Sequence, residues 1–341
     1  MIEHWSRERA AAFIAVPDAE SNKYRRGVLA VRTGSAAYPG AAVLGVEAAW
    51  RTGAGMVRYV PPLDDGPPAL GLPTPAAAVL AARPETVFAD GRAALGARCD
   101  AWLMGSGTDP AERSFAEREA LHSLFIGEAP VVVDAGALLE LTRPEARAAR
   151  GAQRRSGPVA VTPHLGEFRA LWRAAGLGEP PHLEAPPPEP VERSGVSSHP
   201  KPAEGSGVSS ASEPIEGVGA SRQARTDAAR ALAGRLNATV LLKGSVSIVA
   251  TPGGFCAAIG PATPWLATAG TGDVLAGILG ALAATHAAEL RDDPELFGPL
   301  AATAALLHDE AARRASPGGR APLTALDVAH ALPAVIAELL D

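Results

Sequence analysis

The stretch from Leu266 to Ala284 holds the residues best suited to chemistry, because an acid follows two glycines at the start of an apolar run. Gly270 and Gly272 lack a Cβ, so the backbone there can turn tightly and approach a ligand. Asp273 follows at once, and apolar residues recur after it at spacings of three and four, which predicts a helix. The free N–H groups of a first helical turn attract anions. An acid beside such a site makes chemical sense if it removes a proton while the backbone holds a phosphate.

A plainer interpretation of the same stretch stays open. Asp is a common residue in the first turn of a helix, where it only caps free N–H groups. A Gly-x-Gly pair before a helix is a weak signal by itself. The pattern therefore predicts a helix start at Asp273, with an acid that is either a cap or a base.

Three more polar residues follow runs that read as buried strands. The carboxyl ends of parallel strands are where ligand sites gather. Asp134 is either a turn residue or the acid of a metal or phosphate site, and these two interpretations are evenly matched. His164 lies beside a glycine and an acid, which favours a functional role over a structural one. Lys243, followed by a glycine, is either a nucleotide contact or a charge at a strand end.

Alternating strands and helices form the scaffold that would position these residues. Residues 28–31 are predicted to form a buried strand, 41–52 a helix and 56–60 the next strand. This strand–helix–strand unit requires a parallel sheet and an α/β fold. Similar patterns predict strands at 100–104, 130–133, 159–161 and 239–242, a hairpin of 247–250 with 255–259 that adds an antiparallel edge, and helices at 7–14, 76–82, 114–125, 222–236, 299–314 and 325–340.

The overall composition excludes several classes of protein. The chain has 341 residues, of which 47% are hydrophobic and 20% charged, so it can bury a large core. The net charge of −6 gives no electrostatic reason to expect nucleic acid or an anionic membrane as a partner. No apolar run approaches the roughly 20 residues of a spanning helix. Two cysteines, Cys99 and Cys256, without a secretion signal at the start, favour the cytoplasm and argue against a disulfide framework.

Two segments differ from this pattern. Residues 1–22 are predicted to be a mobile lead-in. Residues 178–221 are rich in Pro, Gly, Ser and Glu, and they contain the sequence SGVSS twice. Such a composition cannot bury enough apolar surface to offset the entropy of ordering. It predicts a disordered surface insertion rather than a boundary between domains.

Several stretches together resemble the ADP/ATP-dependent NAD(P)H-hydrate dehydratases, a family of the ribokinase-like superfamily, in its stand-alone bacterial type. They are KYRRGVLAV with PGAAVLGVEAAWRTGAGMVRYV, then VVVDAGAL, VTPHLGEF, VLLKGSVSIVA and ATAGTGDVLAGILGAL. Each motif alone is weak, whereas the ordered set covers nearly the whole chain apart from the lead-in and 178–221. The resemblance implies one ribokinase-like α/β domain over residues 1–341, with a central mostly parallel sheet and helices on both faces.

The activity that the resemblance implies is the repair of damaged cofactors. Reduced nicotinamide cofactors take up water on the nicotinamide ring and become the hydrates NADHX and NADPHX. The family phosphorylates the hydroxyl of the S epimer with ADP (bacterial type) or ATP and then eliminates phosphate, which restores NADH or NADPH. With ADP as the donor, the other products are AMP and phosphate.

The resemblance also implies roles for particular residues. Asp273 would be the base that activates the hydroxyl of the hydrate, and Gly270 and Gly272 would offer backbone N–H groups to the transferred phosphoryl group. The implied nucleotide-binding residues are Lys243, Gly244, Ser245, Val246, Ser247, Gly270 and Gly272. The implied substrate-binding residues are Ala41, Gly107, His164 and Asp273.

Partners are implied in the same way. Mg²⁺ is expected because phosphoryl transfer needs its charge, although the sequence shows no ligand set for a metal. The family implies a homo-oligomer, often a tetramer. The dehydratase-like motifs begin at Lys23, which predicts that the epimerase of this pathway is a separate protein.

Two other functions stay open at this stage. A ribokinase-like small-molecule kinase of the hydroxyethylthiazole or pyridoxal type would share Asp273, the glycines and the fold. The Pro39-Gly40-Ala41 helix start and the T-P-H-x-G-E pattern favour the dehydratases. A catalytically inactive nucleotide-binding protein is the second alternative, and the presence of both Asp273 and Lys243 argues against it.

Overall fold

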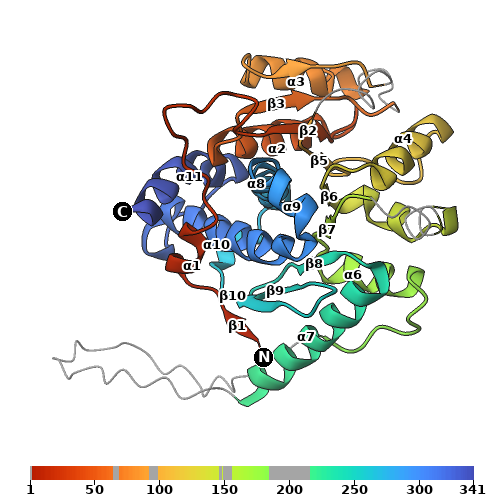
Figure 1. The fold of residues 1–341 in the computed structure, drawn as a ribbon, viewed down its shortest axis with the longest axis vertical. Helices are drawn as coiled ribbons and strands as arrows, with labels where there is room; N and C mark the ends of the chain where they lie inside the picture. The colour runs from red at the N-terminus through yellow and green to blue at the C-terminus, as the bar shows by residue number, and fades with distance from the viewer. Residues whose placement is uncertain (1, 64–68, 92–98, 146–147, 149–155, 184–215) are drawn as a thin grey trace, which may run out of the picture.

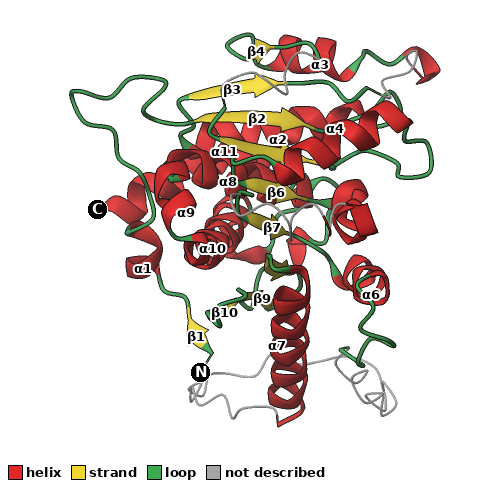
Figure 2. Ribbon diagram, turned by 45° about the vertical axis from the view of Figure 1, so that its right-hand side comes forward, coloured by secondary structure: helices red, strands yellow, loops and turns green. Residues whose placement is uncertain are grey.

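One sheet runs through the computed structural model, which describes residues 2–63, 69–91, 99–145, 148, 156–183 and 216–341 (Figures 1 and 2). The ten described strands lie in the order β1-β10-β9-β8-β7-β6-β5-β2-β3-β4. They are β1 (Glu3–His4), β2 (Val28–Arg32), β3 (Met56–Tyr59), β4 (Val87–Phe88), β5 (Ala101–Met104), β6 (Val131–Val133), β7 (Val159–Val161), β8 (Thr239–Leu242), β9 (Ser247–Ala250) and β10 (Cys256–Ile259).

The central strands are parallel. Their short runs of buried Val, Leu and Ala are typical of parallel strands, which are covered on both faces. Among the described strands only β9 runs against its neighbours, and it pairs antiparallel with both β8 and β10. The predicted hairpin is therefore confirmed. Its outer strand, however, is not the edge of the sheet, because β1 pairs with β10 in parallel.

The prediction of a mobile lead-in is wrong for its first residues. Glu3 and His4 add β1 to the sheet, and Trp5 is only 5% exposed. The Trp5 indole N–H donates to the Thr303 hydroxyl at 3.2 Å, so a residue near the start of the chain packs on a helix near its end. The helix expected at 7–14 forms as α1 (Arg7–Ala11). A single tryptophan amid charged residues carries no periodicity, which is why the sequence pattern did not reveal this anchor.

Helices cover both faces of the sheet, as the sequence predicted (Figure 1). One apolar core holds residues of α1, α2, α8, α9, α10 and α11, and the other holds residues of α4, α6, α7 and the 3₁₀ helix Ala135–Thr142. The helices are α2 (Pro39–Thr52), α3 (Pro75–Ala82), α4 (Phe115–Ile126), α6 (Leu165–Ala174), α7 (Glu216–Leu236), α8 (Thr271–Thr285), α9 (Ala287–Asp292), α10 (Phe297–Ala315) and α11 (Ala325–Leu340). The predicted cap of the last helix is confirmed, because Thr324 and Asp327 form a reciprocal capping box.

The segment predicted to be an insertion, 178–221, has described residues at both of its ends. Residues 184–215 lie outside the described part of the chain, so the expected disorder stays a prediction there. At one end Leu183 is 1% exposed and belongs to the second core, and at the other α7 already begins at Glu216. The average composition of the segment hid these two ordered ends.

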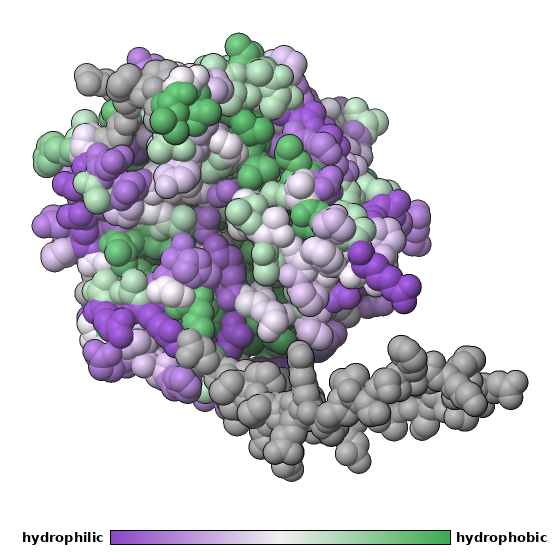
Figure 3. Space-filling model, turned by 180° about the vertical axis from the view of Figure 1, so that it is seen from behind, coloured by the Kyte–Doolittle hydropathy of each residue, from purple (hydrophilic) through white to green (hydrophobic). Residues whose placement is uncertain are grey.

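Both cysteines are free, and Cys256 is buried. Within the described residues, no helix combines the length and the apolar character needed to cross a bilayer. On the back of the molecule, polar and apolar residues are interspersed over the surface (Figure 3).

Helices α2 and α8 approach each other closely because α8 carries a glycine at the contact. A Cβ on Gly277 would lie 2.4 Å from the Gly45 carbonyl oxygen and 2.8 Å from the Ala48 Cβ. This contact sets the position of the first turn of α8, where Asp273 lies.

We therefore predict that Gly277→Ala lowers the free energy of unfolding by about 1–3 kcal/mol, because the added methyl group forces the two helices apart. Gly45→Ala is the matched control, since its Cβ would meet Leu103 at an ordinary 3.5 Å. Urea denaturation measures both variants. Equal stability of Gly277→Ala and the wild type would show that the contact is looser than described.

Candidate active site

The candidate site lies where strand order changes direction along the sheet. The chain passes from β2 to β3 on one side, and β5 then pairs with β2 on the other side. In parallel sheets such a reversal leaves a crevice beyond the carboxyl ends of the strands. Here the Gly34 N–H donates to the Ser106 carbonyl at 2.7 Å and joins the loops that leave β2 and β5.

Ala41 and Gly107 meet at this reversal. Gly107 has a φ of 67°, and a Cβ at this position would lie 2.5 Å from the Ala41 Cβ. Both the left-handed backbone and the close contact require glycine. The loop after β5 is therefore held against the first turn of α2.

The first turn of α8 faces the same region. Its N-cap is Gly270, with a φ of 88°, and no side chain caps the turn. This left-handed backbone favours glycine, and a Cβ there would lie 2.6 Å from Leu44 Cδ1 of α2. The N–H groups of this turn and the helix dipole form an anion site of the kind expected from the sequence. Lys243 Nζ lies 3.5 Å from where a Gly272 Cβ would be, so a cation lies beside that site.

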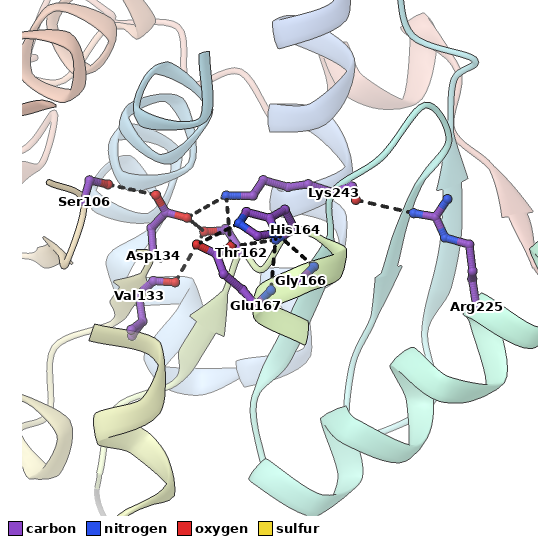
Figure 4. A network of polar contacts seen from close by, with 9 residues as sticks. All are labelled: Ser106, Val133, Asp134, Thr162, His164, Gly166, Glu167, Arg225 and Lys243. Carbon is purple, nitrogen blue, oxygen red and sulfur yellow. Dashed lines mark hydrogen bonds and ion pairs between the residues drawn. The ribbon is translucent and has the colours of Figure 1, made fainter. Parts of the chain in front are cut away.

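A buried polar network supports this lysine (Figure 4). Lys243 Nζ donates to Asp134 Oδ1 at 2.8 Å, and Thr162 Oγ1 donates to the same oxygen at 2.7 Å. Ser106 Oγ donates to Asp134 Oδ2 at 2.9 Å. Glu167 Oε2 lies 3.9 Å from Lys243 Nζ. These residues come from the ends of β5, β6, β7 and β8 and from the first turn of α6.

The charges of the network stabilise one another. Burial opposes the ionised form of Asp134, but Lys243 and the two hydroxyl groups outweigh it and lower the pKa of Asp134. Burial likewise opposes the charge of Lys243, while Asp134 and Glu167 outweigh it and raise the pKa of the lysine. Asp134 is therefore ionised and Lys243 protonated at neutral pH.

Asp273 behaves differently because no cation in the described part of the chain forms a salt bridge with it. Burial, followed by repulsion from Asp134, raises the pKa of Asp273 to about 7, while Ser106 and Lys243 lower it only in part. A carboxylate of this pKa can accept a proton near neutral pH, as a general base must. The sequence pattern did not decide whether Asp273 caps the helix or acts as a base. Its partial burial and raised pKa favour the base.

His164 is the N-cap of α6. Its Nδ1 accepts the N–H groups of Gly166 at 3.0 Å and Glu167 at 3.2 Å, and Glu167 Oε2 accepts the His164 N–H at 2.7 Å. The ring also reaches the cavity described next, and the side chain is 60% exposed. His164 thus has a structural role, and it is accessible to a ligand.

A cavity of about 490 Å³ opens beside the first turn of α8. It has a polar part next to Lys243 and a wall that is largely apolar. The lining residues are His164, Lys243, Gly244, Ser245, Ser247, Ile259, Ala262, Thr263, Pro264, Leu266, Ala267, Thr271, Gly272, Leu275, Ala305, His308 and Asp309. An apolar cleft with a few convergent polar groups is the usual form of a small-molecule site.

The structure brings the predicted residues together in two groups. Most of the expected nucleotide residues line the cavity, namely Lys243, Gly244, Ser245, Ser247 and Gly272. Val246 is not among the lining residues and packs against the second core. Ala41 and Gly107 lie together on the α2 side of α8. Asp273 and Gly270 also lie next to α2, since a Cβ on Gly45 would be 3.8 Å from the Asp273 carbonyl oxygen and a Cβ on Gly270 would be 2.6 Å from Leu44. His164 was grouped with Ala41 and Gly107, but its side chain lines the cavity.

Sequence reasoning missed some residues of the site. Asp134 stayed undecided, and its place at the end of a valine strand was the only signal. Ser106, between Gly105 and Gly107, and Thr162 were not singled out, yet both bind Asp134. Hydroxyl side chains are so common that only the structure distinguishes these two.

The fold and the site are those of a ribokinase-like α/β protein. Helix α8 begins at Gly270 without a side-chain cap, Asp273 lies in its first turn, and Lys243 lines the adjacent cavity. A model of the NAD(P)H-hydrate dehydratase family matches residues 29–185 and 209–333. The chain belongs to this family.

Known relatives support the assignment. The bifunctional NAD(P)H-hydrate repair enzyme Nnr of Mycobacterium tuberculosis is 36% identical over 276 residues, which are 81% of this chain and 44% of that protein. The ADP-dependent (S)-NAD(P)H-hydrate dehydratase of Xanthomonas campestris is 30% identical over 275 residues, which are 79% of this chain and 76% of that protein. The chain thus spans about half the length of the bifunctional relatives, and its expected stand-alone type stays a prediction.

A solved structure shares the fold. The ADP/ATP-dependent NAD(P)H-hydrate dehydratase of Bacillus subtilis superposes with a TM-score of 0.68 at 24% identity, covering 99% of both chains. Together with the family match, this confirms the ribokinase-like fold. The family match also favours the dehydratases over the small-molecule kinases that the sequence left as an alternative.

The ion pair of Lys243 with Asp134 gives a first prediction for the site. Lys243→Met should lower the free energy of unfolding by about 3 kcal/mol, because it leaves the 2%-exposed Asp134 as an unpaired buried charge. Adding Asp134→Asn should recover most of this loss. Thermal unfolding is the measurement.

Arg173→Met is the control for that experiment. Arg173 pairs with Glu179 at 3.0 Å, but the two side chains are 54% and 85% exposed, so the loss should stay below about 1 kcal/mol. If the double variant were no more stable than Lys243→Met, the charge of Asp134 would not be the cause.

The raised pKa of Asp273 gives a second prediction, with a definite sign. Its folded pKa of about 7 lies above the ordinary value of 3.8, so the ionised form destabilises the fold, and this penalty grows as pH rises between these values. Asp273→Asn should therefore unfold at a higher temperature than the wild type, and the gap should be larger at about pH 8 than at about pH 5. If Asp273→Asn were less stable than the wild type at about pH 8, the assigned pKa of Asp273 would be refuted.

Proposed function

We propose that this protein dehydrates the S epimers of NADHX and NADPHX to NADH and NADPH, with ADP as the phosphoryl donor, in the cytoplasm. The observation that carries the proposal is the first turn of α8, where Asp273, with a pKa of about 7, lies beside uncapped N–H groups and Lys243. Such a site can deprotonate a hydroxyl and hold a phosphoryl group at the same time. Family membership supplies the substrate class.

The first step is phosphoryl transfer. Asp273 takes the proton of the hydrate hydroxyl, whose oxygen attacks the terminal phosphorus of the nucleotide. The bond from that phosphorus to the bridging oxygen breaks, and ADP leaves as AMP. The N–H groups after Gly270 and the charge of Lys243 stabilise the negative oxygens of the transferred group, which is the main help that this reaction needs.

The second step is elimination. Phosphate departs with the electrons of its bond to the ring carbon, and the lone pair of the ring nitrogen forms a double bond to that carbon. Loss of a proton from the neighbouring ring carbon then gives the dihydronicotinamide. The elements of water are thereby removed separately. The hydroxyl oxygen leaves in the phosphate, and the two protons come from the hydroxyl and from the neighbouring ring carbon.

The two groups of predicted residues suit two ligands. The nucleotide would occupy the cavity lined by Lys243, Gly244 and Ser247, and the hydrate would lie on the α2 side, near Ala41 and Gly107. Asp273 would act between the two ligands, because it follows Gly272 of the cavity lining and its carbonyl oxygen lies near Gly45 of α2. His164 would contact the nucleotide or the hydrate from the start of α6.

The residues of the site suit a Mg²⁺ ion that binds together with the nucleotide. Among the described residues, no three His, Cys, Asp or Glu side chains gather to hold a metal by themselves. Mg²⁺ usually combines phosphate oxygens and water with one or two carboxylates. Glu167 could serve as such a carboxylate, because its Oε2 lies 3.9 Å from Lys243 Nζ, whereas Asp134 already accepts three hydrogen bonds. When bound, the ion would neutralise phosphate charge.

ADP is proposed as the donor because the relative of Xanthomonas campestris is named ADP-dependent. The name of the solved Bacillus subtilis relative includes both ADP and ATP, and that protein was crystallised with ATP and Mg²⁺. A homo-oligomer, and an epimerase on a separate chain that supplies the S epimer, remain parts of the proposal.

The direct test mixes purified protein and Mg²⁺ with NADHX and either ADP, ATP or no nucleotide, and follows the absorbance of the reduced nicotinamide. We expect a rise with ADP that exceeds the rise with ATP. A stable phosphorylated product without a rise would instead indicate a small-molecule kinase, and bound nucleotide without any product would indicate an inactive protein.

Asp273→Asn tests the base. Turnover should fall by about a hundredfold or more, because general-base catalysis is lost, whereas ADP affinity measured by calorimetry should change little. The wild-type rate should also fall as pH drops below about 7, where Asp273 takes up a proton. Full turnover in the variant would remove Asp273 from the mechanism.

A further inference from the structure

The loops that follow β5 and β6 cross each other closely at two points. At one point, a Cβ on Gly105 would lie 2.1 Å from the Asp134 carbonyl oxygen. At the other, a Cβ on Gly136 would lie 2.1 Å from the Thr108 carbonyl oxygen. Glycine is required at both crossings, because the neighbouring backbone cannot yield to a side chain. Both loops carry residues of the proposed site, so a shift of either loop would displace that site.

The backbone of the second loop is strained directly after Asp134. Ala135 has a φ of 46°, in the left-handed region that a residue with a Cβ avoids. The side chain of the preceding Asp134 accepts the hydrogen bond of Lys243 at 2.8 Å. Strain of this kind persists only where the surrounding contacts hold the backbone in place.

Arg113 supplies such contacts from a buried position. Its guanidinium group donates to Glu140 Oε1 at 2.9 Å, and the two side chains are only 2% and 6% exposed. It also donates to the Thr108 hydroxyl and to the Gly136 carbonyl, each at 3.0 Å. The Thr108 hydroxyl in turn donates to the Gly105 carbonyl at 2.8 Å. One side chain thus joins both loops to the 3₁₀ helix that follows the second.

We propose that Arg113 is a positioning residue of the proposed reaction, which holds Ala135 in its left-handed conformation. It thereby fixes Asp134 against Lys243, and it fixes the loop of Gly107 against α2. Arg113 acts through these loops and not by touching a ligand. A guanidinium group suits this role because its rigid fork of N–H donors reaches several acceptors at once. The proposal rests on the function proposed above.

Arg113→Lys is the test variant, because it keeps a positive charge beside Glu140. A single ammonium group on a flexible stem cannot bind Glu140, Thr108 and Gly136 together in the same geometry. We expect the unfolding temperature to fall by only a few degrees, about what a loss of one or two hydrogen bonds causes. The kcat for NADHX with ADP should fall about tenfold or more, because displaced site groups no longer meet the substrate correctly.

A second substitution separates positioning from a general loss of stability. Glycine adopts the left-handed conformation without the cost that a Cβ brings. Adding Ala135→Gly to Arg113→Lys should therefore raise kcat about threefold or more above that of the single variant. All rates are measured well below the unfolding temperature of every variant, so that stability alone does not change them.

Arg32→Lys is the matched control. Arg32 is 1% exposed, pairs with Glu117, and donates to the carbonyl groups of Pro61 at 3.1 Å and Gly91 at 3.3 Å. These acceptors carry none of the proposed site residues. The control should lose a similar amount of stability to Arg113→Lys, yet keep its kcat within about twofold of the wild type.

Crystal structures of the wild type and Arg113→Lys without ligands make the result independent of the reaction. We expect Ala135 to leave the left-handed region in the variant, and an unchanged loop would overturn the proposal. An equal loss of kcat in Arg113→Lys and Arg32→Lys, or no recovery with Ala135→Gly, would also overturn it. If the wild type does not consume NADHX, the proposed function fails, and the crystal structures alone decide whether Arg113 holds the loop.

Discussion

The site depends on a half-buried lysine that pairs with one of two neighbouring aspartates and leaves the other without a salt bridge among the described residues. Lys243 pairs with Asp134, which also accepts hydrogen bonds from Ser106 and Thr162 and so stays ionised. Asp273 receives no such pair, and the charge of Asp134 raises its pKa further. The same salt bridge therefore keeps the lysine charged for a phosphate and leaves the second acid basic enough to take a proton. Two carboxylates of one type acquire different roles through their surroundings alone.

Close backbone contacts hold these charges in place. Gly277 lets α8 lie against α2, Gly270 lets its first turn lie against Leu44, and Gly107 lets the loop after β5 rest on Ala41. Each contact is too short for a Cβ. Positions of charged groups set by such contacts cannot drift without separating packed elements, and this rigidity is what electrostatic catalysis requires.

The local elements of this fold could be predicted because their signals are local. Runs of Val and Leu bounded by glycine predict the central strands, and Thr324 with Asp327 predicts the start of α11. The pairing of β1 with β10 could not be predicted in this way. It accompanies the contact of Trp5 with Thr303, two residues that lie 298 positions apart in the sequence. The same limit applies to the site. The glycines and Asp273 indicate an anion-binding helix start from a local pattern, whereas the role of Asp134 depends on Ser106, Thr162 and Lys243, which lie far away in sequence.

The arrangement also explains how one site could serve both steps of the proposed reaction. In a kinase the phosphorylated product leaves, whereas here the ester must lose its phosphate. The oxygens that carry negative charge during transfer are the same oxygens that carry it during elimination, and the first turn of α8 with Lys243 faces them throughout. The second step thus needs no new anion site, only a ring nitrogen that supplies electrons from the substrate itself. A site that binds phosphate strongly in the transfer already favours its departure from carbon, because both transition states place charge on the same group.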